Sequence, residues 1–265
     1  MRRSAAGSAR QSTHAEGVAV RSTSYAGVPC VVCEPSRSAR TLLYFHGGGY
    51  RLGSPEASTP FATRLASATA STVVLVGYRL APEHPFPAGL HDAAAVYGEL
   101  LDTGAEHVVV AGDSAGGGLA AALVVAASDS GLPLPDALVL MSAWLDLCCN
   151  GETFVSRAGT DELFSLGAAR EASEMYLQDH DATDPLASPL QARLGRWPRA
   201  MVLASTDEVL LEDSVAFASM LALAGVPVVA RFESGVPHAW PSVFPDLPES
   251  RVALDAVGEF LGKGG

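Results

Sequence analysis

The stretch VVVAGDSAGGGLAAALVVAA, residues 108–127, constrains the fold more than any other part of the sequence. Its first part is β-branched and apolar, as in a buried strand, and its second part is rich in alanine, as in a helix. Asp113 and Ser114 stand where the two parts meet, with glycines around them. A surface loop would not need residues this small, and a core segment would not keep a hydroxyl beside a carboxylate. We therefore predict a strand, a tight turn and a helix.

The rest of the chain repeats this alternation. The first apolar runs follow one another closely, as antiparallel hairpins do, and a strand–helix alternation begins after Phe45. That order predicts an α/β fold with a mostly parallel eight-stranded sheet and helices on both faces. The expected strands are residues 18–23, 28–34, 41–45, 72–77, 107–111, 137–141, 200–204 and 228–232, and the expected helices are residues 57–69, 90–103, 115–128, 213–224 and 249–261.

One segment interrupts the alternation. Residues 145–198 contain no obvious strand and carry a charged, helical-looking piece at 161–181. A long insertion between two strands usually lies over the carboxyl edge of such a sheet, where ligands bind. We expect a small cap there, within a single domain of residues 18–265 that follows a flexible arm of residues 1–17.

Charge and cysteine content limit the partners and the compartment. The formal net charge is −12, which disfavours binding to phosphate backbones and anionic lipids. The sequence has no good membrane span and its start lacks an apolar signal region, which favours the cytoplasm. Cys30 and Cys33 should lie on opposite faces of a strand, and Cys148 and Cys149 lack a second pair at metal-site spacing. We expect reduced thiols, no metal and no nucleic-acid partner.

The glycines beside Ser114 have a steric explanation. A tight strand-to-helix turn brings the positions two before and two after the serine, Gly112 and Gly116, against neighbouring backbone. The strained turn lifts the serine hydroxyl out of the sheet edge, and the helix dipole favours negative charge beside it. Such a G-x-S-x-G turn is a nucleophile elbow, although the short pattern alone also fits a plain helix N-cap by Ser114 or Asp113.

A second glycine cluster, HGGGYRLGS, follows the expected strand at 41–45. No G-K-[ST] follows it and no complete G-x-G-x-x-G is present, so a phosphate loop is disfavoured. Glycines also leave backbone N–H groups free to point into a cavity, as an oxyanion hole requires. We assign this role to Gly48, Gly49 and the N–H of Ala115, and we expect His46 to brace the loop.

A serine hydroxyl needs a base, and the chain has seven histidines. His238, in SGVPHAW, follows the last expected strand, so its loop returns to the carboxyl edge that also holds Ser114. The acid that orients it should follow the preceding strand, where MVLASTDEVL places Asp207 and Glu208. Asp207 comes first on the turn and is the preferred partner, with Glu208 in reserve.

Together, HGGGY, YRLAPEHPFPAG, GDSAGGGLA, DPLASPL and PHAW resemble the bacterial hormone-sensitive-lipase-like esterases over nearly the whole chain from about Val18. The resemblance implies an α/β-hydrolase fold, a triad of Ser114, Asp207 and His238, and hydrolysis of small-molecule carboxylic esters without a cofactor. It also implies that the HGGG loop, with Gly47, shapes the oxyanion hole and that Asp113 supports the elbow. By analogy, a homodimer through the last strand and last helix is expected.

The chain departs from this family in two places. A short, small-residue arm stands where members usually carry a helical cap, so either the site is more open or residues 145–198 supply most of the cap. Ala239 also replaces the glycine that usually follows the histidine, which narrows the pocket.

Three other functions remain open. An arylformamidase-like amide hydrolase typically has a tryptophan soon after HGG, where this chain has Tyr50. A biosynthetic lactone hydrolase, dehydratase or cyclase would fit the altered N-terminus. A binding protein resembling the plant gibberellin receptors is disfavoured, because those receptors have lost the histidine that is present here as His238.

Overall fold

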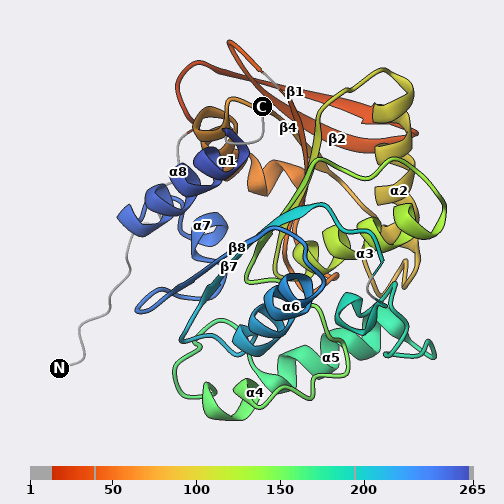
Figure 1. The fold of residues 1–265 in the computed structure, drawn as a ribbon, viewed down its shortest axis with the longest axis vertical. Coiled ribbons are helices and arrows are strands. Elements are labelled where there is room, and N and C mark those ends of the chain that lie inside the picture. The colour runs from red at the N-terminus through yellow and green to blue at the C-terminus, as the bar shows by residue number, and fades with distance from the viewer. Residues whose placement is uncertain (1–13, 39, 194, 263–265) are drawn as a thin grey trace.

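The computed structural model of the chain describes residues 14–38, 40–193 and 195–262. Within them one eight-stranded sheet runs in the order β1-β2-β4-β3-β5-β6-β7-β8 (Figure 1). Strands β1 and β2 are antiparallel to their neighbours, and β3 to β8 are parallel. The strands are β1 (Val18–Tyr25), β2 (Val28–Pro35), β3 (Thr41–Phe45), β4 (Thr72–Val76), β5 (Val108–Asp113), β6 (Ala137–Met141), β7 (Arg199–Ser205) and β8 (Val228–Glu233).

Helices cover both faces of the sheet, because alternate strand residues point to opposite sides. Leu42 and Tyr44 of β3 pack with α1 and α8, whereas Leu43 and Phe45 pack with α2, α3 and α6 on the other face. The predicted fold class is thereby confirmed. The helices are α1 (Pro55–Thr69), α2 (Ala88–Asp102), α3 (Ala115–Asp129), α4 (Thr153–Ser156), α5 (Leu166–Leu177), the 3₁₀ helix η1 (Pro189–Gln191), α6 (Leu211–Leu223), α7 (Trp240–Val243) and α8 (Pro248–Gly262).

The cysteines of β2 occupy both core layers. Cys30 belongs to the layer under α2 and α3, and Cys33 to the layer under α1 and α8, as the strand period predicts. Burial raises the pKa of each thiol to about 11. These two thiols therefore act as small apolar side chains in the core.

The connection between β6 and β7, residues 145–198, contains no strand among its described residues. The helix expected at 161–181 is shorter, because α5 begins only at Leu166, where Ser165 accepts a hydrogen bond from the Ala168 N–H. Before it, the Asp161 carboxylate accepts hydrogen bonds from Leu163 and Phe164 and holds them in a turn.

A buried carboxylate fixes the start of this connection. Oδ2 of Asp213 on α6 accepts hydrogen bonds from the N–H groups of Leu145 and Asp146, at 2.8 and 3.0 Å. Burial raises the pKa of Asp213 to about 7, against the effect of these two donors. The segment therefore leaves the sheet edge at a defined place.

The sequence predicts a flexible N-terminal arm and no membrane-spanning segment. Residues 1–13 of the expected N-terminal arm lie outside the described residues, and β1 begins at Val18 as predicted. None of the helices in the described ranges is long and apolar enough to cross a membrane.

Candidate active site

Ser114 stands at the turn between β5 and α3 in a strained backbone conformation, with φ 52° and ψ −123°. Such a conformation costs about 1–3 kcal/mol and persists only where the surroundings enforce it. The N–H of Ser114 donates to the Met141 carbonyl at the end of β6. A Cβ at Gly112 or Gly116 would lie 2.3 or 2.1 Å from a backbone oxygen, so neither position can carry a side chain.

His238 lies against this serine. Its Nε2 is 3.0 Å from Ser114 Oγ, although the residues are 124 positions apart, and both are buried. A carboxylate faces the other ring nitrogen, Nδ1, which favours a proton there. In that tautomer the Ser114 hydroxyl donates its hydrogen bond to Nε2.

The acid beside His238 is not the residue preferred from the sequence. Glu208 Oε2 lies 3.4 Å from His238 Nδ1, an ion-pair distance, and Glu208 is fully buried. Asp207 instead accepts a hydrogen bond from the Gly235 N–H at its Oδ2, 2.7 Å away, and is partly exposed. The two residues are consecutive on one turn, so their side chains diverge. The structure therefore places the reserve candidate, Glu208, where Asp207 was expected.

A residue that the sequence analysis missed connects Glu208 to the segment that carries His238. Ser142, just past β6, donates from its Oγ to Glu208 Oε2 at 2.7 Å and accepts from the Ala239 N–H at 3.0 Å. It is fully buried and has a positive φ of 50°. Its place at the carboxyl end of a parallel strand, between β5 and β7, was the available signal.

The surroundings of His238 favour its charged form. Burial alone lowers the pKa of the imidazole, but the Glu208 carboxylate raises it, with smaller contributions from Asp161 and Asp113. The net result is a pKa above the ordinary value of 6.5. The site thus stabilises an imidazolium ion, which forms whenever His238 accepts a proton.

The glycine loop after β3 presents unpaired donors. Gly48 has φ +119°, a conformation that L side chains rarely adopt, and a Cβ there would lie 2.2 Å from the Leu52 carbonyl. Across the described residues, the N–H groups of Gly48, Gly49 and Ala115 have no hydrogen-bond acceptor. The N–H of Gly47, by contrast, donates to Asp113 Oδ1.

Four side chains hold this loop in place through hydrogen bonds and ring stacking. Asp113 Oδ1 also accepts from the Tyr44 hydroxyl, which ties the elbow to β3. His46 contacts the Gly47 carbonyl through Nδ1 at 2.8 Å, and its ring stacks on Tyr78. The Tyr78 hydroxyl donates to the His46 carbonyl at 2.7 Å. Burial lowers the pKa of His46, so its neutral form is favoured.

These groups open into a cleft of about 330 Å³. Ser114, His238, Gly48 and Gly49 line it together with apolar side chains from the β6–β7 connection, from α7 and from the loop before α1. The Phe164 ring lies nearly parallel to the His238 imidazole, at 5.8 Å between centroids. The cleft therefore combines a nucleophile, a base and free N–H donors with an apolar wall.

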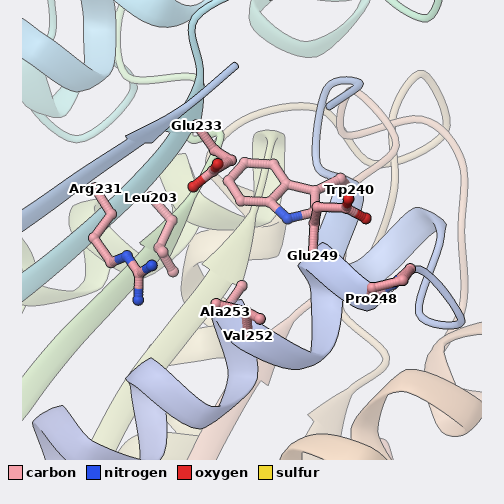
Figure 2. Close-up of a pocket in the computed structure, with 8 residues that line it drawn as sticks. All are labelled: Leu203, Arg231, Glu233, Trp240, Pro248, Glu249, Val252 and Ala253. Atoms are coloured by element: carbon pink, nitrogen blue, oxygen red, sulfur yellow. The ribbon is translucent and has the colours of Figure 1, made fainter. Parts of the chain in front are cut away.

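A second hollow lies between β8, α7 and α8 (Figure 2). It measures about 170 Å³ and is lined by Leu203, Arg231, Glu233, Trp240, Pro248, Glu249, Val252 and Ala253. No serine, cysteine or histidine is among these residues. The hollow therefore lacks the nucleophile and base that the cleft at Ser114 contains.

Comparison with known proteins identifies relatives along most of the chain. Residues 42–242 match the family described as alpha/beta hydrolase fold. The chain is 40% identical to an acetyl-hydrolase of Streptomyces hygroscopicus over 230 residues, 86% of this chain and 77% of that protein. It is 33% identical to an esterase of Acinetobacter venetianus over 247 residues, 92% of this chain and 82% of that protein.

Comparison with solved structures also identifies esterases. An esterase from the bacterial hormone-sensitive lipase family superimposes with a TM-score of 0.92 at 35% identity, covering 95% of this chain and 86% of that one. The esterase EstE5, in a crystal soaked with p-nitrophenyl butyrate, gives a TM-score of 0.91 at 35% identity with the same coverage.

Proposed function

From the premise that this chain belongs to the alpha/beta hydrolase family and is a carboxylic ester hydrolase, we propose that it cleaves short-acyl esters through an acyl-enzyme on Ser114. The observation that carries the proposal is the 3.0 Å contact between Ser114 Oγ and His238 Nε2 at the mouth of an apolar cleft. Glu208 takes the place of the third triad member.

The first half of the reaction forms the acyl-enzyme. His238 Nε2 accepts the Ser114 proton as Oγ attacks the ester carbonyl carbon. The carbonyl oxygen becomes an oxyanion and accepts hydrogen bonds from the N–H groups of Gly48, Gly49 and Ala115. Glu208 stabilises the imidazolium, which then protonates the departing alkoxide and releases the alcohol.

The second half restores the enzyme. Water takes the place of the alcohol, His238 removes its proton, and the hydroxide adds to the acyl carbon. The second oxyanion uses the same N–H donors. When it collapses, the bond to Ser114 Oγ breaks, Oγ regains a proton from the imidazolium, and a carboxylic acid leaves.

A series of p-nitrophenyl esters from acetate to decanoate tests this function. The cleft of about 330 Å³ predicts the highest kcat/KM for acyl chains of two to four carbons and a steep fall beyond. A fluorophosphonate probe should label one serine per chain, at Ser114. Absence of labelling together with absence of ester hydrolysis would refute the proposal.

The expected homodimer belongs to the same proposal. Its support is the outer edge of β8, which among the described strands pairs with β7 alone and which exposes Val229 and Phe232. Light scattering of wild type and of Val229→Glu would test it, with a dimer expected for wild type and a monomer for the variant. A monomeric wild type would contradict it.

Two other expectations from the sequence stay predictions. The net charge of −12 supports the absence of a nucleic-acid partner, which a filter-binding assay at low salt would check. The expected cytoplasmic location would be checked by fractionating the native host.

A further inference from the structure

A second, larger cleft adjoins the catalytic one. It measures about 580 Å³ and shares Leu163 with the cleft at Ser114. The two clefts also meet at α7, where Val243 lines the first and the next residue, Phe244, lines the second. Residues 235–237, which lead directly into His238, form another wall of the second cleft. It therefore lies on the His238 side of the reacting centre.

The proposed chemistry fixes which part of an ester points there. The oxyanion must face Gly48, Gly49 and Ala115, whereas the leaving oxygen must come within hydrogen-bond reach of His238 Nε2. The alcohol portion therefore extends from the carbonyl carbon past His238. The second cleft shares Leu163 with the catalytic cleft and is bounded by the segment just before His238, so it is the adjoining space that a large alcohol portion can enter.

The polar groups of the second cleft are mainly hydrogen-bond acceptors. The Glu162 side chain is exposed and, within the described ranges, has no hydrogen bond or ion pair. Asp207 uses Oδ2 to hold the Gly235 N–H, and its Oδ1 accepts one long hydrogen bond, 3.5 Å, from the Thr206 hydroxyl, so Oδ1 can still accept from a ligand. The hydroxyl of Thr160 donates to the Asp207 carbonyl, which leaves its lone pairs available.

This lining selects one class of alcohol. No lysine or arginine is among the lining residues, so a phosphate or carboxylate on the alcohol would be unfavourable there. Acceptors with spare capacity match a group that carries several hydroxyl donors. The volume of about 580 Å³ exceeds that of the catalytic cleft, about 330 Å³, and accommodates a ring-sized group.

We propose that the second cleft binds the alcohol portion of the substrate, and that the preferred substrates are short-acyl esters of bulky, polyhydroxylated alcohols. This inference rests on the proposed function, because it uses the direction in which the leaving alcohol departs. Within it, Glu162 is a specificity-determining residue that acts on the alcohol and not on the acyl group.

Three acetates test the proposal. Methyl 6-O-acetyl-glucopyranoside carries a hydroxylated ring, cyclohexylmethyl acetate carries a ring of the same size without hydroxyls, and ethyl acetate carries no ring. For wild type, kcat/KM should be about tenfold higher for the glucoside ester than for cyclohexylmethyl acetate, the equivalent of one or two net hydrogen bonds.

Two substitutions sharpen the test. Glu162→Trp fills the cleft and should lower the ratio of kcat/KM for the glucoside ester to that for ethyl acetate by about tenfold. Glu162→Gln keeps the size and removes the charge, and should lower the ratio by a smaller factor of about two to three. Glu174→Trp, the same change at an exposed position on α5, is the matched control and should leave the ratio as in wild type.

The outcomes separate the two proposals. If ethyl acetate is hydrolysed but wild type favours cyclohexylmethyl acetate, the alcohol site is refuted and the esterase stands. The same holds if Glu162→Trp changes the ratio no more than Glu174→Trp does. If wild type hydrolyses none of the three acetates and no p-nitrophenyl ester, the proposed function itself fails.

Discussion

The cleft at Ser114 and the hollow beside α8 share one short segment of the chain, since His238 lines the first and Trp240 lines the second. The hollow presents more charge, from Arg231, Glu233 and Glu249, but these groups stand on flexible side chains. The cleft presents backbone N–H groups and a serine whose position the backbone fixes. From this comparison we expect hydrolytic chemistry to depend on groups held by the main chain at the carboxyl ends of parallel strands, and not on the amount of charge in a hollow.

Ser114→Ala tests the contrast between the cleft and the hollow, and we expect it to lower kcat more than any other substitution. Without the hydroxyl no acyl-enzyme forms, so kcat should fall by about 10⁴–10⁶-fold on p-nitrophenyl acetate. The matched control is Ser130→Ala at the far end of α3, which should retain wild-type turnover. A Ser114→Ala enzyme within tenfold of wild type would place the chemistry elsewhere.

The neighbouring acids give the next largest effect. Glu208→Gln removes the charge beside His238 Nδ1 and should lower kcat by about 10³–10⁴-fold. Asp207→Asn is the control one residue away, and it should cost less than about tenfold, because its carboxylate accepts hydrogen bonds from the Gly235 N–H and the Thr206 hydroxyl and does not contact His238. Steady-state kinetics of both variants shows which acid assists His238. A larger loss of kcat in Asp207→Asn than in Glu208→Gln would restore Asp207 as the triad acid.

The pH dependence checks the charge state of His238. Only the neutral imidazole can accept the Ser114 proton, and its pKa lies above 6.5 because the effect of Glu208, together with smaller contributions from Asp161 and Asp113, outweighs the lowering effect of burial. Below that pKa, kcat/KM should fall about tenfold per pH unit. In Glu208→Gln the carboxylate is gone and burial remains, so the inflection should move to lower pH. An inflection that stays in place would show that Glu208 does not set this pKa.

Ser142 should produce a smaller effect. Its loss leaves the Ala239 N–H and Glu208 Oε2 each without one partner, at a cost of about 1–3 kcal/mol, so we expect kcat to fall about tenfold or somewhat more. Ser142→Gly and Ser142→Ala should lose similar activity. Because φ is 50°, the glycine variant should have the higher Tm of the two. Equal wild-type activity in both variants would remove Ser142 from the positioning network.

The hollow beside α8 should give the smallest effect. Glu249→Gln removes a charge from its lining while preserving size, and kcat/KM should stay within about twofold of wild type. Measuring kcat/KM of the variant and of wild type on p-nitrophenyl acetate and ethyl acetate checks this prediction. A tenfold loss would mean that the hollow communicates with His238 through α7 and would overturn the contrast between the two regions.

The sequence was sufficient to predict those features that follow from a single structural rule. Strand periodicity placed Cys30 and Cys33 in opposite core layers, and the glycines around Ser114 indicated close backbone contacts that the structure contains. The position after β8 similarly brought His238 to the serine.

The sequence was insufficient where the direction of a side chain determined which residue occupies the site or where a helix begins. Asp207 and Glu208 follow the same strand, and only the course of the turn determines which one faces His238. The start of α5 depended on the Asp161 carboxylate, which competes with the helix for the N–H groups of Leu163 and Phe164. Ser142 carries no motif, because its role arises from contacts with two distant segments.

The attachment of the β6–β7 connection has a consequence for how such an enzyme can diversify. The connection contributes Leu163 and Phe164 to the substrate walls but neither Ser114, His238 nor Glu208. It leaves the sheet at a point fixed by Asp213, outside the elbow. Thr160 and Asp161 bond the turn that carries Glu208, so exchanges elsewhere in the connection can alter the repertoire of accepted esters while the reacting atoms keep their places. A laboratory search for new substrates should begin by randomising this segment outside these two residues and leave the strand ends untouched.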